Sequence, residues 1–179
     1  LTGTFAPGEM MLTNFDSEKY SPKFSGHETF PLRFGWLKKA YDAVEASNSQ
    51  GEQQNPFKDE AAIAKFGVGK NMVVSMQYWA EATNTIEFSK LTDESGKKEP
   101  TPKPGFLGQN IFSDDGFDPY LENPSSIWLL HWYLISRAQL TTWHWAFNYF
   151  NNMEFDREQL VKAISKTAVD RGWQRRASQ

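Results

Sequence analysis

The stretch FGVGKNMVVSMQYWAEA, residues 66–82, decides the fold that we expect for this chain. Gly67 and Gly69 flank one apolar residue and permit a tight turn with positive φ after the helix-like run 59–65. Lys70 then begins a second run that reaches residue 82 without proline or glycine. The pattern predicts a helix, a tight turn and a second helix.

Such a pair buries apolar residues where the helices meet and leaves the first turn of the second helix free to enter the DNA major groove. The residues expected in the core are Ala62, Phe66, Val68, Val73 and Met76. The residues expected to face outward and contact DNA are Gly69, Lys70, Asn71, Ser75 and Gln77. A cation and amides there suit contacts with phosphates and base edges. The alternative is an ordinary helical hairpin.

The composition limits the classes of protein to consider. The chain has 179 residues, no cysteine and a formal net charge of −3. The absence of cysteine excludes disulfides and a cysteine nucleophile, and no apolar run reaches the roughly 20 residues that span a bilayer. We therefore expect a cytoplasmic protein without membrane contact. The net charge argues against indiscriminate coating of nucleic acid, but local basic patches remain able to bind DNA.

Residues 24–33, FSGHETFPLR, form the most unusual segment. Thr29 can cap a helix and Pro31 can begin it, so we expect a helix that runs to about Ala46. Its expected apolar stripe is Leu32, Trp36, Leu37, Ala40, Tyr41 and Val44. Its basic residues, which suit contacts with DNA phosphates, are Arg33, Lys38 and Lys39.

His27 and Glu28 stand just before this expected helix. A histidine beside a carboxylate can supply a general acid, a general base or a metal ligand. The pattern lacks the second histidine of an HExxH zinc site. The alternative to a catalytic pair is a hydrogen-bonded structural corner at the entrance of the helix.

Two strands are expected after the helix pair. Residues 86–88 alternate like a short strand, and residues 105–113 are expected to return as its partner. The polar segment 90–104, rich in Lys, Glu and Pro, is expected to be a mobile loop between them. Two short strands after such a helix pair are typical of a winged helix.

The last third of the chain changes character. Residues 114–124 carry four acids without the regular calcium-loop pattern, which favours a solvated linker. From Ser125 the chain reads as aromatic helices, the first apolar on nearly every side and therefore expected to be buried. Asp156 is expected to cap the last helix. His131 and His144 are expected to be buried, hydrogen-bonded residues.

We thus predict a mainly α protein in which a winged-helix-like domain packs on an aromatic-rich helical subdomain. Residues 1–23 are expected to be a leader or disordered. The winged-helix-like, DNA-binding domain with its two-stranded wing spans residues 24–113, and a linker spans 114–124. The helical subdomain covers residues 125–179.

Three stretches, FSGHETFPLRFGWLKKAYD, FGVGKNMVVSMQYWAEA and DPYLENPSSIWLLHWYLIS, resemble in this order a bacterial family first catalogued as domain of unknown function four-thousand-seven. The resemblance spans about residues 24–173. The family includes SspB, the DNA-nicking component of Ssp phosphorothioation and phage-defence systems. Family members usually continue further, so the resemblance implies an N-terminal part whose helical subdomain is truncated at its C-terminal end.

The resemblance implies work on double-stranded DNA beside a cysteine desulfurase, a sulfur-transfer enzyme and an ATPase. A nick would expose the strand for replacement of a phosphate oxygen by sulfur. Within this chain His27 and Glu28 are then the leading catalytic candidates, and Arg33 would stabilise charge on the attacked phosphate. A divalent metal ion is a candidate cofactor, with its ligands undetermined.

Three hypotheses follow: a DNA nicking endonuclease, a DNA-binding module without catalysis, and a scaffold that recruits sulfur-transfer enzymes to DNA. The residues favour DNA binding for this chain. The resemblance favours nicking for the full-length protein.

Overall fold

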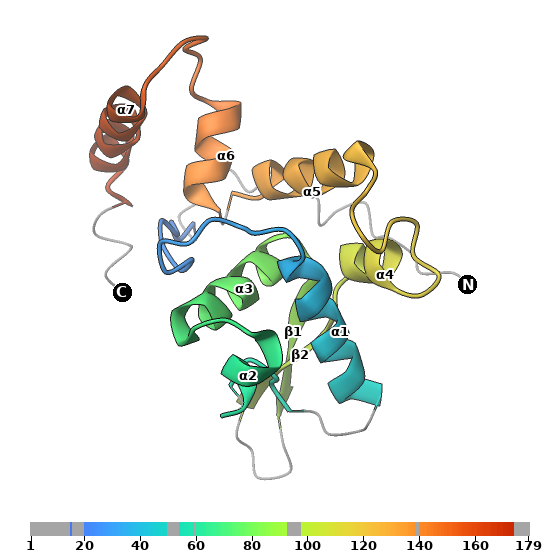
Figure 1. Ribbon diagram of the computed structural model, residues 1–179. Coiled ribbons are helices and arrows are strands. Elements are labelled where there is room, and N and C mark those ends of the chain that lie inside the picture. The colour runs from blue at the N-terminus through green and yellow to red at the C-terminus, as the bar shows by residue number, and fades with distance from the viewer. Residues whose placement is uncertain are drawn as a thin grey trace. The chain divides into compact units, whose positions relative to one another are not determined.

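Seven helices and one two-stranded antiparallel sheet make up the described part of the chain in the computed structural model (Figure 1). The structure describes residues 15, 20–49, 54–58, 60–92, 98–138 and 140–173. The elements are α1 (Trp36–Ser49), α2 (Ala62–Phe66), α3 (Lys70–Ala82), β1 (Ile86–Thr92), β2 (Lys98–Pro104), α4 (Phe106–Phe112), α5 (Pro124–Ser136), α6 (Thr141–Asn148) and α7 (Arg157–Asp170). This content confirms the prediction of a mainly α protein.

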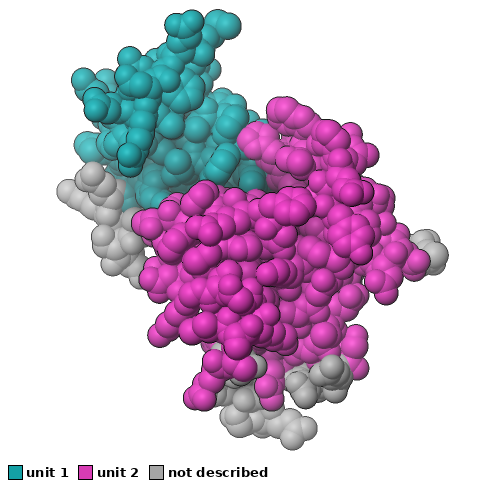
Figure 2. All heavy atoms as spheres, viewed as in Figure 1, with its two compact units in different colours: residues 1–24, 134–179 teal, residues 25–133 magenta. Residues whose placement is uncertain are grey.

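The chain forms two compact units (Figure 2). The first unit contains residues 1–24 and 134–179, and the second contains residues 25–133. The second unit thus includes the expected linker 114–124 and ends within α5. The finer domain division drawn from the sequence stays a prediction.

The core of the second unit lies between α1 and α3, which pack against each other. Leu37, Tyr41 and Val44 of α1 are buried, as are Val73 and Met76 of α3. These residues recur at three- and four-residue spacing, which places them on one face of each helix. The apolar stripes expected for both helices are therefore largely present.

The start of α1 corrects the sequence prediction. The helix begins at Trp36, not near Pro31, and Leu32 remains 36% exposed. Thr29 does not cap a helix, because it has a φ of 64° and takes part in a tight turn. Residues 25–35 therefore form turns and other non-helical backbone before the helix starts.

The two strands also correct the prediction. β1 pairs with β2 so that Phe88 lies opposite Pro102 and Ile86 lies opposite Pro104. The second strand thus comes from the proline-rich segment expected to be a loop, and the expected strand 105–113 contains the helix α4 (Phe106–Phe112) instead. Residues 93–97 of that expected loop lie outside the described residues.

The return into α4 depends on a close backbone approach. Gly105 donates its amide to the Thr85 carbonyl (3.0 Å), and Gly108 donates to the Asn84 carbonyl (3.1 Å). A Cβ at either glycine would collide with the backbone of residues 84–85. Because only glycine permits this contact, the chain leaves the strand at Gly105 and begins a helix.

The first unit has an aromatic core. Tyr20, Trp145 and Trp173 are its largest buried members, and the buried Phe15 ring packs edge-on against Tyr20 and Trp173. The Tyr20 hydroxyl donates to the Ala138 carbonyl (2.8 Å). Burial of this hydroxyl raises the pKa of Tyr20 above its ordinary value. The predominantly aromatic composition of this region therefore does produce a core.

Asp156 caps α7 as predicted. Its carboxylate accepts the Gln159 amide (2.8 Å), and the Gln159 side chain accepts the Asp156 amide (3.1 Å). This reciprocal pair is a capping box, which satisfies two amides that the first turn of a helix leaves unpaired.

α5 is not buried on every side, so that expectation is wrong. Ile127 is 55% exposed, Trp128 70% and Trp132 48%. His131 is half-buried and contacts Trp128 edge-on. His144 is buried as expected and bonds through Nδ1 to the Ile135 carbonyl at 2.7 Å. Each helix within the described ranges is too short or too polar to cross a membrane.

Candidate nucleic-acid interface

The turn between α2 and α3 presents the first residues of α3 to solvent. Gly67 adopts the left-handed conformation (φ 67°, ψ 32°) and donates its amide to the Ile63 carbonyl, which ends α2. Gly69 is extended and forms the N-cap of α3, so α3 begins at Lys70. Lys70 and Asn71 are both exposed, as predicted. A flexible cation and an amide therefore stand at the leading end of this helix.

One face of α3 is accessible along its length. Asn71 and Val74 are exposed, Gln77 and Tyr78 are half-buried, and Glu81 is exposed. Their spacing of three to four residues places them on one side of the helix. Val74, at 43% exposure, was not singled out from the sequence. The available face is thus basic at its N-terminal end and acidic at Glu81.

Ser75 does not belong to that face, so its predicted outward orientation is wrong. It is fully buried, and its hydroxyl donates to the Phe30 carbonyl at 3.2 Å. Trp79 donates its indole N–H to the same carbonyl at 3.0 Å. Ser75 therefore anchors residues 25–35 to α3 and cannot contact a duplex without unfolding this attachment.

Lys39 brings a second cation to the turn. Its ammonium donates to the Phe66 carbonyl (3.3 Å) at the C-terminal end of α2, where a positive charge is favourable. The neighbouring Lys65 is exposed on the last turn of α2. Sequence reasoning missed Lys65, although its position one residue before Phe66 could have identified it. Three lysines thus lie at the α2–α3 turn: Lys39, Lys65 and Lys70.

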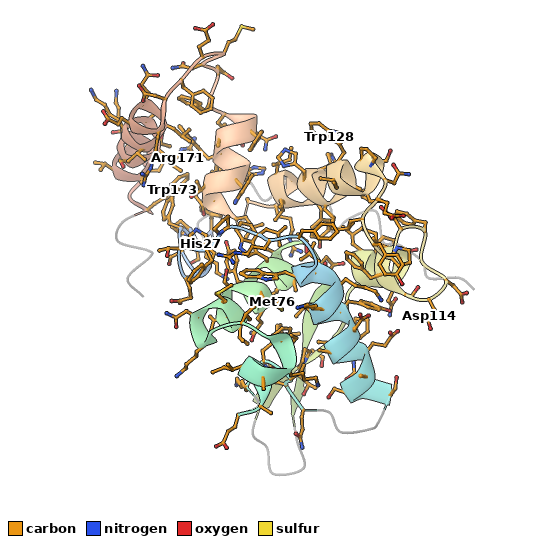
Figure 3. All side chains as sticks on the ribbon, in the orientation of Figure 1. His27, Met76, Asp114, Trp128, Arg171 and Trp173 are labelled. Atoms are coloured by element: carbon orange, nitrogen blue, oxygen red, sulfur yellow. The ribbon has the colours of Figure 1, made fainter. Side chains whose placement is uncertain are left out.

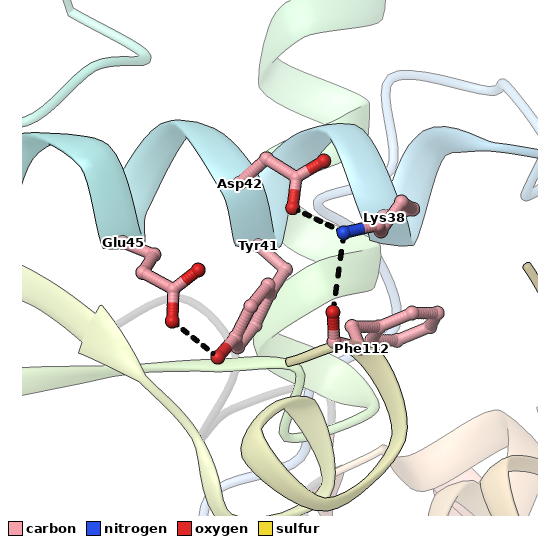
Figure 4. Close-up of polar contacts among 5 residues, drawn as sticks. All are labelled: Lys38, Tyr41, Asp42, Glu45 and Phe112. Atoms are coloured by element: carbon pink, nitrogen blue, oxygen red, sulfur yellow. Dashed lines mark hydrogen bonds and ion pairs between the residues drawn. The ribbon is translucent and has the colours of Figure 1, made fainter. Parts of the chain in front are cut away.

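Lys38 has structural partners that the sequence did not reveal (Figure 4). Its ammonium pairs with the Asp42 carboxylate at 2.6 Å and donates to the Phe112 carbonyl at 3.1 Å. On the next turn, the Tyr41 hydroxyl donates to Glu45 at 2.8 Å, and burial together with this carboxylate raises the pKa of Tyr41 far above its ordinary value. Lys38 therefore connects α1 to the end of α4, and its role as a phosphate ligand stays a prediction.

Arg33 is exposed, and the described contacts of its guanidinium are with aromatic rings and not with the α2–α3 turn. Its guanidinium lies 5.7 Å from the centre of the Trp36 ring and 6.0 Å from that of Phe30. Such cation–π contacts restrain the side chain while leaving its donors available. The next residue, Phe34, is 86% exposed.

His27 lies in a tight turn against the C-terminal half of α3 (Figure 3). Its ring stacks on Trp79, with centroids 5.9 Å apart and planes 6° from parallel, and meets Tyr78 edge-on at 5.8 Å. The Phe30 amide donates to the His27 carbonyl (2.9 Å), which closes the turn. Glu28 and Thr29 occupy its two central positions with φ of 48° and 64°.

The three predicted catalytic residues do not form one joined group among the described residues. The His27 ring contacts Thr29, Tyr78 and Trp79, whereas the Arg33 guanidinium contacts aromatic rings. Glu28 is exposed beside His27 in the sequence. The catalytic roles stay a prediction for all three residues.

The part of the chain that the structure describes does not bring together enough side-chain ligands for a metal ion. No group of three His, Asp or Glu side chains able to hold a metal occurs there. In the acidic segment, Asp118 uses both carboxylate oxygens to accept the amides of Glu122 (2.9 Å) and Asn123 (3.1 Å). The Ser126 hydroxyl and these two amides lower the pKa of Asp118, because they favour its charged form. Asp118 therefore organises the start of α5 and does not present a vacant ligand.

Comparisons with known proteins agree with the resemblance seen in the sequence. A family model described as "Protein of unknown function (DUF4007)" matches residues 24–179. Two SspB crystal structures, one of them magnesium ion-bound, are each 33% identical and cover 83% of this chain, with TM-scores of 0.68 and 0.69. The chain spans only 43–44% of the length of those SspB chains. No curated protein sequence matches it.

Proposed function

Because the chain belongs to the DUF4007 family and is similar in structure to SspB, we propose that it binds double-stranded DNA as part of a DNA nickase acting in phosphorothioate modification and anti-phage defence. α2 and α3 act as the helix-turn-helix. The observation that carries the proposal is the exposure of Lys70 and Asn71 at the start of α3, three and four residues after the left-handed Gly67.

The charges around the turn support this orientation toward DNA. Lys39, Lys65 and Lys70 are all exposed and contribute positive charge at the same end of the helix pair. Phosphate contacts by such residues supply most of the affinity of nucleic-acid binding and position the protein on the duplex. Asn71 can then donate to and accept from an adenine edge in the major groove.

The β1–β2 hairpin takes the role of the wing. It follows α3 directly, and its strands are antiparallel neighbours, as a winged helix requires. Lys103 lies on β2, where it pairs with Glu87 at 2.8 Å. Because both side chains are about half exposed, this pair can open to a phosphate at little energetic cost.

Nicking is proposed for the whole protein, with His27 and Glu28 as the residues of this chain that would take part. His27 supports the idea by its position against α3, since a base-reading helix would bring the DNA backbone close to it. No step through a metal ion is assigned, because the described residues lack a set of three ligands. Partner enzymes of the Ssp type, a cysteine desulfurase, a sulfur-transfer enzyme and an ATPase, belong to the same proposal.

The test is a salt titration of binding to a labelled mixed-sequence duplex. Replacing Lys70 with Ala should weaken binding and reduce the slope of log K against log salt concentration by about 1, because one phosphate contact is lost. Asn71→Ala should relax the preference for one base pair and leave the salt slope unchanged.

The matched control is Lys166→Ala, which removes an exposed lysine of α7 in the other compact unit. Equal salt slopes for the Lys70 and Lys166 variants would refute the proposed orientation of α3. Binding that does not depend on salt would refute the DNA-binding role itself.

A scaffold role is the second candidate, and the exposed Trp128 and Trp132 of α5 favour it. α5 contains no Asp, Glu, Lys or Arg, so this surface suits a protein partner better than a phosphate backbone. Its expected signature is loss of partner binding without loss of DNA binding when Trp128 is replaced.

A further inference from the structure

The turn His27–Phe30 has an unfavourable backbone for its sequence. Both central residues have positive φ, which defines a type I′ turn when the first and fourth residues are hydrogen-bonded. Such turns normally use Asn-Gly, whereas this chain places Glu28 and the β-branched Thr29 there. A β-branched residue with positive φ is a marked outlier, and such backbone strain destabilises the folded state.

Contacts from α3 hold the turn in this conformation. The Phe30 carbonyl accepts hydrogen bonds from Ser75 and Trp79, and the Trp79 indole also stacks on the His27 ring. The strain is therefore imposed by buried contacts of a helix, while the side chains of Glu28 and Thr29 remain exposed. Packing gives no reason for a threonine at this position.

The turn also selects one tautomer of the neutral His27 ring. The Thr29 amide donates to Nδ1 at 3.0 Å, so Nδ1 must carry a lone pair. In the neutral ring the proton is then on Nε2, which makes Nε2–H a hydrogen-bond donor. An N–H donor and the Thr29 hydroxyl, on residues two apart in one rigid turn, suit recognition of a phosphate oxygen.

We propose that the turn His27–Phe30 is a second phosphate-binding site, in which His27 Nε2–H and the Thr29 hydroxyl donate to one phosphate group of the DNA backbone. This inference rests on the proposed DNA binding by α3. It adds a contact at the C-terminal half of α3, about two to three helical turns from Lys70. This contact gives the strained threonine a role that packing does not.

The test compares stability and binding in the Thr29→Gly variant. Glycine adopts positive φ without strain and keeps the amide that donates to His27. We expect the Tm to rise by about 2–4 °C and the Kd for the duplex to rise at least about tenfold, the loss of one hydrogen bond to a charged phosphate. A residue with a structural role only would give a more stable protein with unchanged or tighter binding.

Two further variants complete the experiment. His27→Phe keeps a ring against Trp79 and removes the Nε2 donor, so it should also weaken binding. Leu121→Gly relieves another non-glycine residue with positive φ (53°) and should leave binding unchanged.

The outcomes separate this inference from the proposed function. Binding that is weakened by Lys70→Ala but unaffected by Thr29→Gly and His27→Phe overturns the second site alone. A lower Tm for Thr29→Gly overturns the strain argument. Absence of DNA binding by the unaltered chain overturns both proposals.

Discussion

α3 and α5 are both helices of 13 residues. The more apolar helix, α5, is nevertheless the more exposed of the two. α3 contains Lys70 and Glu81 and buries Met76 and Trp79 almost completely. α5 contains no charged residue except the ionisable His131 and leaves Trp128 70% exposed. Polar residues at helical spacing therefore reveal which side of a helix is buried, whereas uniform apolar character does not.

The largest expected effect is at Trp79. Trp79→Ala removes a buried indole, its hydrogen bond to Phe30 and its stacking on His27. We expect a loss of about 3–5 kcal/mol in the free energy of unfolding, measured by urea denaturation. A loss below about 1 kcal/mol would mean that α3 is not part of the core, and the comparison with α5 would fail.

A smaller effect is expected at Asp118, which tests how α5 is held at its start. Asp118→Asn leaves one acceptor oxygen where two amides now bond, so the Tm at neutral pH should fall. The lowered pKa of Asp118 means that its stabilisation is complete above the unfolded pKa, near 4, and is lost as the pH falls through the lower folded value.

Thermal scans of both proteins from neutral to acid pH provide the measurement for Asp118. The Tm difference between wild type and Asp118→Asn should shrink at the acid end. A difference that persists there would assign the effect to packing and not to the charge.

The smallest expected effect is at Trp128. Trp128→Ser should change the free energy of unfolding by no more than about 0.5 kcal/mol, because the side chain is mostly in solvent. If α5 forms a docking surface, the same variant should lose partner binding in a pull-down with the Ssp-type enzymes. A large loss of stability would show that Trp128 packs in solution and would remove the contrast with Trp79.

The sequence predicted the elements whose signals are local. Gly67 and Gly69 located the turn before α3, and Asp156 located the start of α7. The second strand was missed because three prolines lower the strand propensity of Lys98–Pro104. The strand forms because its pairing with β1 stabilises it despite this low propensity. The start of α1 was missed because Thr29 adopts a backbone conformation that its side chain disfavours.

The candidate site was predictable only where no distant partner takes part. Lys70 and Asn71 are exposed because the turn beside them leaves them so. Ser75 was misplaced because its acceptor, the Phe30 carbonyl, lies 45 residues away in the sequence. The partner of Lys38, the Phe112 carbonyl, lies 74 residues away. Helical periodicity alone contains no information about such partners.

The alternation of prolines in β2 has a consequence for how the protein behaves at high concentration. Prolines 100, 102 and 104 lack amide protons, so the donors from β2 to β1 come from the residues between them. The edge of β2 that faces away from β1 consequently offers no regular row of amide donors to a strand from another molecule. An open two-stranded hairpin would otherwise be a template for intermolecular aggregation, and these prolines provide a built-in protection against it.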